Sequence, residues 1–255
     1  MHFRSMIYLG LFSLLLQLAA CASAPAPVKS ADEYFKEGES AYASQNFEEA
    51  ITNYKKVKES FTSPELSTRA ELKIADAQFD NKAYIEAAAA YEDFRKLHPG
   101  HEKTPYALYR LGLSNYHQIS GIDTDQTPVK NAVSYLQSFL NQYPDSPDAK
   151  DAAVKLADCR AKQLAYENYV GNFYLRTGKY PSAIKRLNEA LTRFPNQPGL
   201  DETLFYLGKA YLNSGDTEKG RKVLGRLAVE HPASPKNREA EELLLGFARY
   251  SSQGR

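Results

Sequence analysis

The chain has 255 residues, a formal net charge of +1 and 43% hydrophobic residues. Its nearly neutral charge argues against a nucleic-acid partner, which a strongly basic surface would favour. After the N-terminal region, no apolar run reaches the roughly 20 residues that a transmembrane helix needs, and the length suits one large core or a repeat array.

The first 20 residues have the pattern of a secretory signal. Arg4 supplies the positive flank, and the apolar run from Ile7 to Leu18 is too short to span a bilayer. Small residues then lead into Cys21, in Leu18-Ala19-Ala20-Cys21. This stretch resembles a bacterial lipobox, which implies cleavage before Cys21, diacylglycerol on its thiol and a further acyl chain on its amine. Several acyl chains anchor a protein stably where one would not. An ordinary signal peptide with an accidental cysteine is the alternative.

Residues 21–30 are predicted to be the lipidated cysteine and a flexible tether, because residues 22–30 are small, contain Pro and show no periodicity. The residue after the cysteine is Ala22 and not Asp, which resembles the outer-membrane class of proteobacterial lipoproteins. The resemblance implies a lipid-anchored protein on the periplasmic face of the outer membrane. We expect no cofactor apart from the covalent lipid.

A repeat with a period of 37 residues fills most of the remaining chain. A small residue of a first helix recurs at spacings of 37, 37, 59 and 37, at Gly38, Ala75, Gly112, Gly171 and Gly208. In four of the five copies a second small residue follows twelve positions later, at Ala50, Ala87, Ala183 and Gly220. The two helices of a hairpin would cross at these positions, where a larger side chain would force them apart.

The ends of the repeats agree with helical hairpins. Four of the five second helices run into a Pro, which cannot continue a helix, at Pro99, Pro144, Pro195 and Pro232. The pattern resembles the tetratricopeptide repeat family and is clearest in the fifth copy, with Leu204, Leu207, Gly208, Tyr211, Gly220, Leu224, Leu227 and Pro232. We therefore predict an all-α fold, a tetratricopeptide-repeat superhelix of about five helical hairpins plus a C-terminal helix.

Two departures distinguish this array. The third hairpin carries an insertion, Ser120 to Thr127, between helices that end near Ile119 and begin near Pro128. The fourth opens with a long helical pattern from about Pro147 to Arg176, which we expect to brace the first three hairpins against the last two.

The residues offer no credible catalytic or metal-binding set. His98 and His101 are the only close histidine pair, and we interpret them as solvent-facing residues at a helix C-terminus, where the helix dipole favours them. The segment Asp123-Thr124-Asp125 lacks the later Gly and Glu of a calcium loop, which favours a polar insertion. Cys159 lies in a helical pattern and is expected to be a buried, inert thiol. We therefore predict that the protein is not an enzyme.

Stacked helical hairpins commonly bind peptides or partner helices along the face formed by their first helices. Candidates for a groove in the N-terminal half are Tyr34, Tyr42, Lys73, Gln78, Tyr106, Tyr109, Arg110, Asn115 and Tyr116. Charge is uneven: Ala31 to Thr62 carries a net −3, whereas Arg176 to Arg193 carries a net +4. The basic second helix could meet an acidic partner. For each of these residues, ordinary packing or a solvated face is the alternative.

Together, the lipobox, the tether and the five hairpins with an inserted third turn resemble the BamD family. Its members are lipoproteins of the machine that folds β-barrel proteins into the outer membrane. The similarity is sharpest in three segments, Asp123 to Thr127, Phe139 to Ser146 and Ala165 to Tyr174. The family often has Tyr-Pro after the first hairpin. Here that site is Phe61-Thr62, which puts any substrate contact at that turn in doubt.

The resemblance implies two binding surfaces. Residues 31–144, with repeats 1–3, would hold the groove for unfolded outer-membrane β-barrel proteins. Residues 145–255, with repeats 4–5 and the terminal helix, would dock on a periplasmic domain of the barrel-forming subunit, with other assembly lipoproteins as further partners. Arg186 falls where the family places a basic contact to that subunit, in a cluster with Lys179, Lys185 and Arg193.

Another repeat-containing envelope lipoprotein, or a coordinator associated with the Tol-Pal system, is the alternative. A typical coordinator would carry a coiled coil ahead of its repeats and would lack the inserted turn. A periplasmic enzyme on a helical scaffold is disfavoured because no catalytic motif was found.

Overall fold

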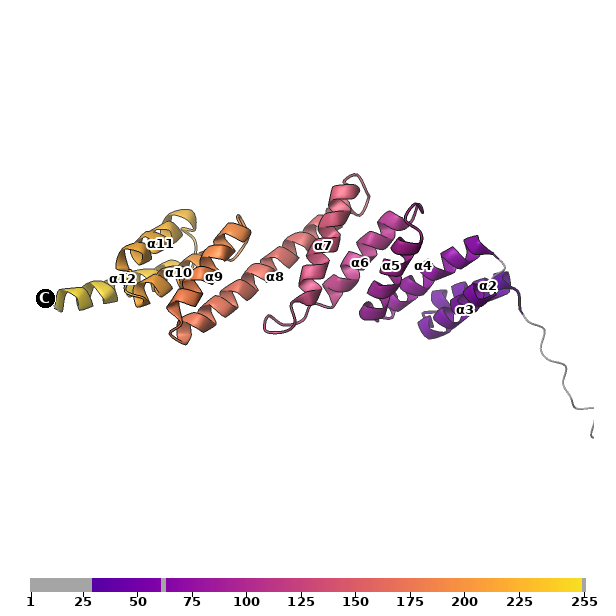
Figure 1. The fold of residues 1–255 in the computed structure, drawn as a ribbon, viewed down its shortest axis with the longest axis horizontal. Helices are drawn as coiled ribbons and strands as arrows, with labels where there is room; N and C mark the ends of the chain where they lie inside the picture. The colour runs from indigo at the N-terminus through magenta and orange to yellow at the C-terminus, as the bar shows by residue number, and fades with distance from the viewer. Residues whose placement is uncertain (1–28, 61–62, 254–255) are drawn as a thin grey trace, which may run out of the picture. The chain divides into compact units, whose positions relative to one another are not determined.

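The computed structural model describes residues 29–60 and 63–253. Within these ranges the protein is all-helical, with eleven helices and no strand (Figure 1). The predicted signal sequence and Cys21 lie outside the described residues, as do Phe61 and Thr62.

The described helices follow the predicted order of five hairpins and a terminal helix. Their bounds are α2 (Ala31–Ala43), α3 (Phe47–Glu59), α4 (Pro64–Asp80), α5 (Tyr84–Leu97), α6 (Thr104–His117), α7 (Thr127–Gln142), α8 (Ala149–Arg176), α9 (Tyr180–Arg193), α10 (Leu200–Asn213), α11 (Thr217–Glu230) and α12 (Lys236–Gln253). The predicted fold class is confirmed. The second helices α5, α7, α9 and α11 each end two residues before a Pro, as the sequence indicates.

The described residues form two compact units whose boundary lies between Ala70 and Glu71, within α4. The first unit contains α2, α3 and the start of α4, and the second contains everything from Glu71 onward. The functional division expected at residue 144 is a different boundary and stays a prediction.

Close contact at the repeated small residues holds the hairpins together. A Cβ added to Gly38 would lie 2.6 Å from Cε1 of Tyr54, and one added to Gly208 would lie 2.6 Å from Cδ2 of Leu224. In each case the bulky residue follows its Gly by 16 positions and is almost completely buried. Gly171 and Leu187 repeat the contact at 2.6 Å. The inserted turn stretches the separation to 24 positions for Gly112 and Leu136, and the contact is kept at 2.8 Å.

Four hairpin turns share one backbone geometry. The residue seven positions after the repeated small residue has a positive φ, at Gln45 (59°), Lys82 (62°), Gly178 (72°) and Gly215 (91°). Its N–H and the next N–H then donate to carbonyls at the end of the first helix. The third hairpin lacks this tight turn, because its insertion connects α6 to α7 by a longer path.

The long helix α8 is confirmed, and its bounds, Ala149–Arg176, lie within two residues of those predicted. Its 28 residues give a length of about 42 Å. Within the second unit it packs against α6 and α7 through its first half and against α9 and α10 through its second half (Figure 1). It therefore links the hairpins before it to those after it, as the sequence indicated. Cys159, on this helix, is completely buried as predicted, and burial raises the pKa of its thiol to about 12, which disfavours the reactive thiolate.

We predict that Gly208→Leu lowers the free energy of unfolding by about 2 kcal/mol or more, because overpacking a close helix crossing typically costs 1–3 kcal/mol. Gly225→Leu is the matched control, since a Cβ there would meet nothing within 4 Å. The control should be neutral or slightly stabilising, because Leu favours a helix more than Gly does. Thermal unfolding that shows equal midpoints for both variants would contradict the crossing.

Candidate functional site

The predicted groove residues divide between the two units. Tyr34 and Tyr42 lie on α2 in the first unit, where both are half-buried. Nζ of Lys56 lies 5.1 Å from the ring centroid of Tyr34, and the ring of Tyr42 meets Phe47 edge-on at 5.5 Å. The other predicted groove residues lie in the second unit, where the structure defines a cluster of hydrogen bonds around one carboxylate.

Asp76 of α4 is the centre of that cluster. Its Oδ1 accepts hydrogen bonds from the hydroxyls of Tyr91 at 2.5 Å and Tyr106 at 2.8 Å. Burial raises the pKa of the Asp76 carboxyl above its usual value, and the two hydroxyl donors partly oppose this. Burial also raises the pKa of both tyrosines, so they remain neutral donors.

Arg110 of α6 completes this group, which we call the Asp76 cluster (Asp76, Tyr91, Tyr106 and Arg110). Its guanidinium lies 3.8 Å from the ring centroid of Phe79, and its Nε donates to the hydroxyl of Tyr91 at 3.1 Å. Its Nη2 also forms an ion pair with Asp80 at 3.2 Å. The positive charge of Lys73, one turn before Asp76 on α4, opposes a small part of the rise in the pKa of that carboxyl. The structure thus brings two predicted groove residues, Tyr106 and Arg110, into the cluster.

Three other candidates serve local packing, whereas Gln78 has a side-chain oxygen that is buried without a hydrogen-bond partner among the described residues. Asn115 is only 5% exposed, and its Nδ2 donates to the carbonyl of Leu111 at 2.9 Å, so it does not reach the open surface. Gln78 is half-buried on α4. The hydroxyls of Tyr109 and Tyr116 donate to α8, to Asp151 at 2.6 Å and Asp158 at 2.8 Å.

Sequence reasoning missed Asp76 and Tyr91, although a signal for them exists in the repeats. The first copy has the same pair, because the hydroxyl of Tyr54 donates to Oε1 of Glu39 at 2.5 Å across the same 15 positions. A buried hydroxyl needs an acceptor, so the carboxylate accompanies the tyrosine. In the last three copies a leucine takes the place of this tyrosine, at Leu136, Leu187 and Leu224. The residue after the repeated small residue is then no longer a carboxylate.

The predicted docking residue Arg186 lies on α9 against a buried carboxylate of α8. Its Nε is 2.6 Å from Oε2 of Glu167, at ion-pair distance but without the alignment of a hydrogen bond. Arg193 lies two turns after Arg186 on the same side of α9. Its Nη1 is 3.5 Å from the other carboxylate oxygen of Glu167. The guanidinium of Arg186 also lies 5.6 Å from the ring centroid of Tyr166. Glu167 therefore orients two arginines, a role that sequence reasoning did not assign.

These two arginines line a cavity of about 280 Å³, which we call the Arg186 pocket. Its walls come from the end of the inserted turn, α7, α8 and α9, at Gln126, Val129, Lys130, Gln163, Tyr166, Glu167, Arg186 and Arg193. Lys179 and Lys185 are exposed but do not line it. The predicted basic cluster is thus divided, with only Arg186 and Arg193 brought together.

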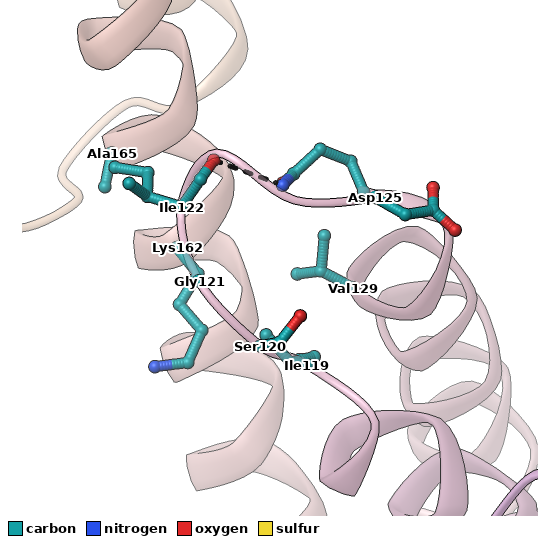
Figure 2. Close-up of a pocket in the computed structure, with 9 residues that line it drawn as sticks. Ile119, Ser120, Gly121, Ile122, Asp125, Val129, Lys162 and Ala165 are labelled. Atoms are coloured by element: carbon teal, nitrogen blue, oxygen red, sulfur yellow. Dashed lines mark hydrogen bonds between the residues drawn. The ribbon is translucent and has the colours of Figure 1, made fainter.

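The inserted turn forms a second cavity of about 190 Å³ against α8, which we call the turn pocket (Figure 2). It is lined by Ile119, Ser120, Gly121, Ile122, Asp125, Gln126, Val129, Lys162 and Ala165. In Figure 2 the turn arches over the space, Ile122 lies beside Ala165, and Val129 points inward from α7. Asp125 accepts hydrogen bonds from the N–H and the hydroxyl of Thr127, at 2.9 and 2.8 Å, which agrees with a polar insertion and not a calcium loop.

The expectation of solvent-facing histidines is only partly right. His98 is half-buried, because its Nε2 lies 2.6 Å from Oε2 of Glu71 and its ring packs against Phe94 at 5.0 Å. The peptide turns after α5 and brings the ring back onto its own helix and α4. Among the described residues, no group of three or more His, Cys, Asp or Glu side chains is arranged to hold a metal ion.

Comparison with known proteins connects this architecture with an envelope function. A family model described as YfiO, outer membrane lipoprotein, matches residues 27–227. The chain is 28% identical over 221 residues to outer membrane protein assembly factor BamD of Vibrio cholerae, covering 82% of this chain and 91% of that protein. The BamD of Neisseria meningitidis is 27% identical over 242 residues, covering 88% of this chain and 90% of that protein.

A further relative and one solved structure complete the comparison. The BamD of Caulobacter vibrioides is 28% identical over 183 residues, covering 71% of this chain but only 60% of that protein. A solved complex of the TPR2AB domain of yeast Sti1 overlaps with a TM-score of 0.41 at 15% identity, over 86% of this chain and 98% of that chain. Among the described helices, none combines the length and the apolar character needed to cross a membrane.

The raised pKa of Asp76 predicts a specific pH dependence. The folded state holds this proton to a higher pH than the unfolded chain, whose Asp pKa is about 3.9. The wild type should therefore gain stability relative to Asp76→Asn as pH falls through the raised pKa toward that value. Urea unfolding of both proteins between pH 8 and pH 2 measures this difference.

Asp125→Asn is the control with the opposite sign. The hydrogen bonds from Thr127 lower the pKa of Asp125, so its contribution is present above the unfolded pKa and is lost as pH falls through the folded pKa. A stability difference for Asp76→Asn that is constant with pH would show that this carboxyl is not perturbed.

Proposed function

Since the chain belongs to the YfiO family of outer membrane lipoproteins, we propose that it is an outer-membrane protein assembly factor that acts by binding and positioning other proteins. The observation that carries this proposal is the family match over residues 27–227, which includes nearly all of the five helical hairpins. The relatives named assembly factor BamD support it across most of the chain.

The Asp76 cluster is the proposed contact for unfolded β-barrel proteins. Tyr106 and Arg110 are both partly exposed and held by short contacts, so they offer an aromatic face and a cation without first having to be ordered. An extended peptide with aromatic residues could stack on the tyrosine and the guanidinium, and its carboxylate groups could pair with the cation. Such contacts tolerate many sequences, which an assembly factor with many substrates requires.

The Arg186 pocket is the proposed contact for a periplasmic domain of the barrel-forming subunit. Three cations line it, Arg186, Arg193 and Lys130, against the single carboxylate of Glu167. The surplus positive charge favours an acidic group on the partner and speeds its association. Other assembly lipoproteins are further proposed partners.

We place the protein on the periplasmic face of the outer membrane, anchored by lipid on Cys21. The family description as an outer membrane lipoprotein supports this. Binding energy alone would account for the function, with no cofactor and no catalysed reaction.

Depletion of the chain from growing cells tests the proposed function directly. Newly made outer-membrane β-barrel proteins should then fail to reach their folded form, as measured by their heat-dependent mobility on gels. Normal folding of these proteins in depleted cells would contradict the assignment and favour the alternative of an envelope coordinator.

We predict that Arg186→Glu reduces co-purification of the barrel-forming subunit from native membranes in mild detergent by tenfold or more. Loss of a paired charge at an interface can cost about 2–5 kcal/mol. This substitution also sets a second carboxylate against buried Glu167, so circular dichroism must verify the fold.

Lys130→Glu provides a second variant that leaves the Glu167 pair intact, since Glu167 is paired with Arg186 and Arg193 and not with Lys130. Lys185→Glu is the matched control for Arg186→Glu, because Lys185 is exposed on α9 next to Arg186 but outside the pocket. Wild-type co-purification by folded Lys130→Glu and Arg186→Glu at low and moderate salt would place docking elsewhere.

We predict that Cys21→Ser releases the protein from the membrane while its helical content is unchanged. Several acyl chains anchor stably, and each buried methylene contributes about 0.8 kcal/mol. Fractionation after removal of peripheral partners with high salt is the measurement. If the serine variant still pellets with membranes, the lipid anchor is ruled out.

A further inference from the structure

The last described helix, α12, carries an apolar cavity that only one helix lines. The cavity measures about 410 Å³, and its lining residues are Glu242, Leu243, Gly246 and Phe247. A cavity between two packed helices takes its lining from both, so the opposite wall of this one has to come from another helix. We propose that a second copy of this chain supplies that wall, with the two α12 helices packed antiparallel about a two-fold axis. This contact lies outside the Asp76 cluster and the Arg186 pocket and does not rest on the proposed function.

Only one side of α12 is covered by the rest of the array. Ala240 is 4% exposed, and Leu244 and Phe247 pack against the core that α10 and α11 form. In Figure 1 the C-terminal turns of α12 extend past α10 and α11. Leu243, Gly246 and the rest of the cavity therefore lie where the support from the array ends, and apolar surface there gains free energy when another helix covers it.

The repeat register shows where another helix can approach α12 closely. Leu244 packs on the core 37 positions after Leu207, so the next residue, Leu245, takes the position of Gly208. The bulk of Leu245 prevents the close crossing that α11 makes with α10 at Gly208. The small residue has moved to Gly246, where an added Cβ would meet nothing within 4 Å. Because consecutive helical residues lie about 100° apart around the axis, the point of closest approach has turned toward the cavity.

The face around Gly246 is complementary to itself. Gly246 leaves a hollow, and Leu243 and Phe247 flank it as bulky apolar side chains. Two copies can therefore each place a bulky side chain beside the glycine of the other, as ridges pack into grooves between helices. A contact about a two-fold axis requires one surface that supplies both shapes, which this face does.

The charges of α12 favour the antiparallel direction. Its first seven residues carry three carboxylates and two cations, whereas its last eleven carry Arg249 and no carboxylate. Antiparallel packing sets each acidic half opposite the basic half of the other copy and also opposes the two helix dipoles. A contact of one helix per copy falls at the low end of interface sizes, so we expect association to be weak and to depend on concentration.

Cysteine crosslinking of the full-length chain in native membranes tests the contact. Under a mild oxidant, Gly246→Cys should give a disulfide-linked product of twice the mass on gels without reductant, because the two-fold axis brings this position close to itself. Val229→Cys is the control and should give no such product, since Val229 is 81% exposed but lies on α11. Cys159 is completely buried and should not contribute. A Gly246→Cys product that contains a different polypeptide, or no product at all, would overturn the inference.

A glycine substitution separates this contact from folding. Gly246→Leu fills the hollow, so it should weaken self-association of the purified full-length chain by about tenfold or more, measured by sedimentation equilibrium in mild detergent. Its thermal midpoint should be unchanged or slightly higher, because the added side chain meets nothing within one copy and Leu favours a helix more than Gly. A wild type that stays monomeric at every concentration reached, or a Gly246→Leu variant that associates as tightly as the wild type, would refute the surface. Neither result would bear on the proposed function, which is measured by the folding of β-barrel proteins in cells.

Discussion

The fold depends on one contact that recurs in each hairpin, between a small residue of the first helix and a bulky residue of the second. At Gly171 and Leu187, as at Gly208 and Leu224, even one added carbon would sit 2.6 Å from the leucine side chain. The contact brings the two helices so close that their remaining apolar side chains interlock into a continuous core. The separation is 16 residues for Gly38, Gly171 and Gly208 and 24 residues for Gly112, so the inserted turn lengthens the connection without removing the contact.

Polar groups follow from the same contact where the bulky residue is a tyrosine. Tyr91 is fully buried and needs an acceptor, and Asp76 provides it from the position after the small residue Ala75. That carboxylate then recruits Tyr106 and lies close to Arg110. A packing requirement in the hairpin thus positions the aromatic and cationic side chains that we assign to peptide binding. The leucine hairpins have no such requirement and no such cluster.

The second surface has a different origin, in the two departures from the repeat. The extended length of α8 carries Glu167 and Tyr166 beneath α9, and the inserted turn brings Gln126 to the same cavity. A buried carboxylate between two arginines is retained because each arginine offsets its desolvation. The arginines are consequently fixed at the rim of a pocket, where an array of identical hairpins would have provided only a smooth helical face.

The sequence by itself determined the helices, their pairing and the long α8. The signals are small residues at fixed spacing, Pro at helix ends and apolar periodicity, which are local and recur in the repeats. It also indicated Arg186, but only by resemblance, and it grouped Arg186 with Lys179 and Lys185, which the structure leaves outside the pocket. Only the tertiary structure placed Glu167 between Arg186 and Arg193, buried Asn115 and turned His98 onto Glu71. Those outcomes depend on side chains from helices far apart in the sequence, whose rotation about their axes is set by packing and not by local pattern.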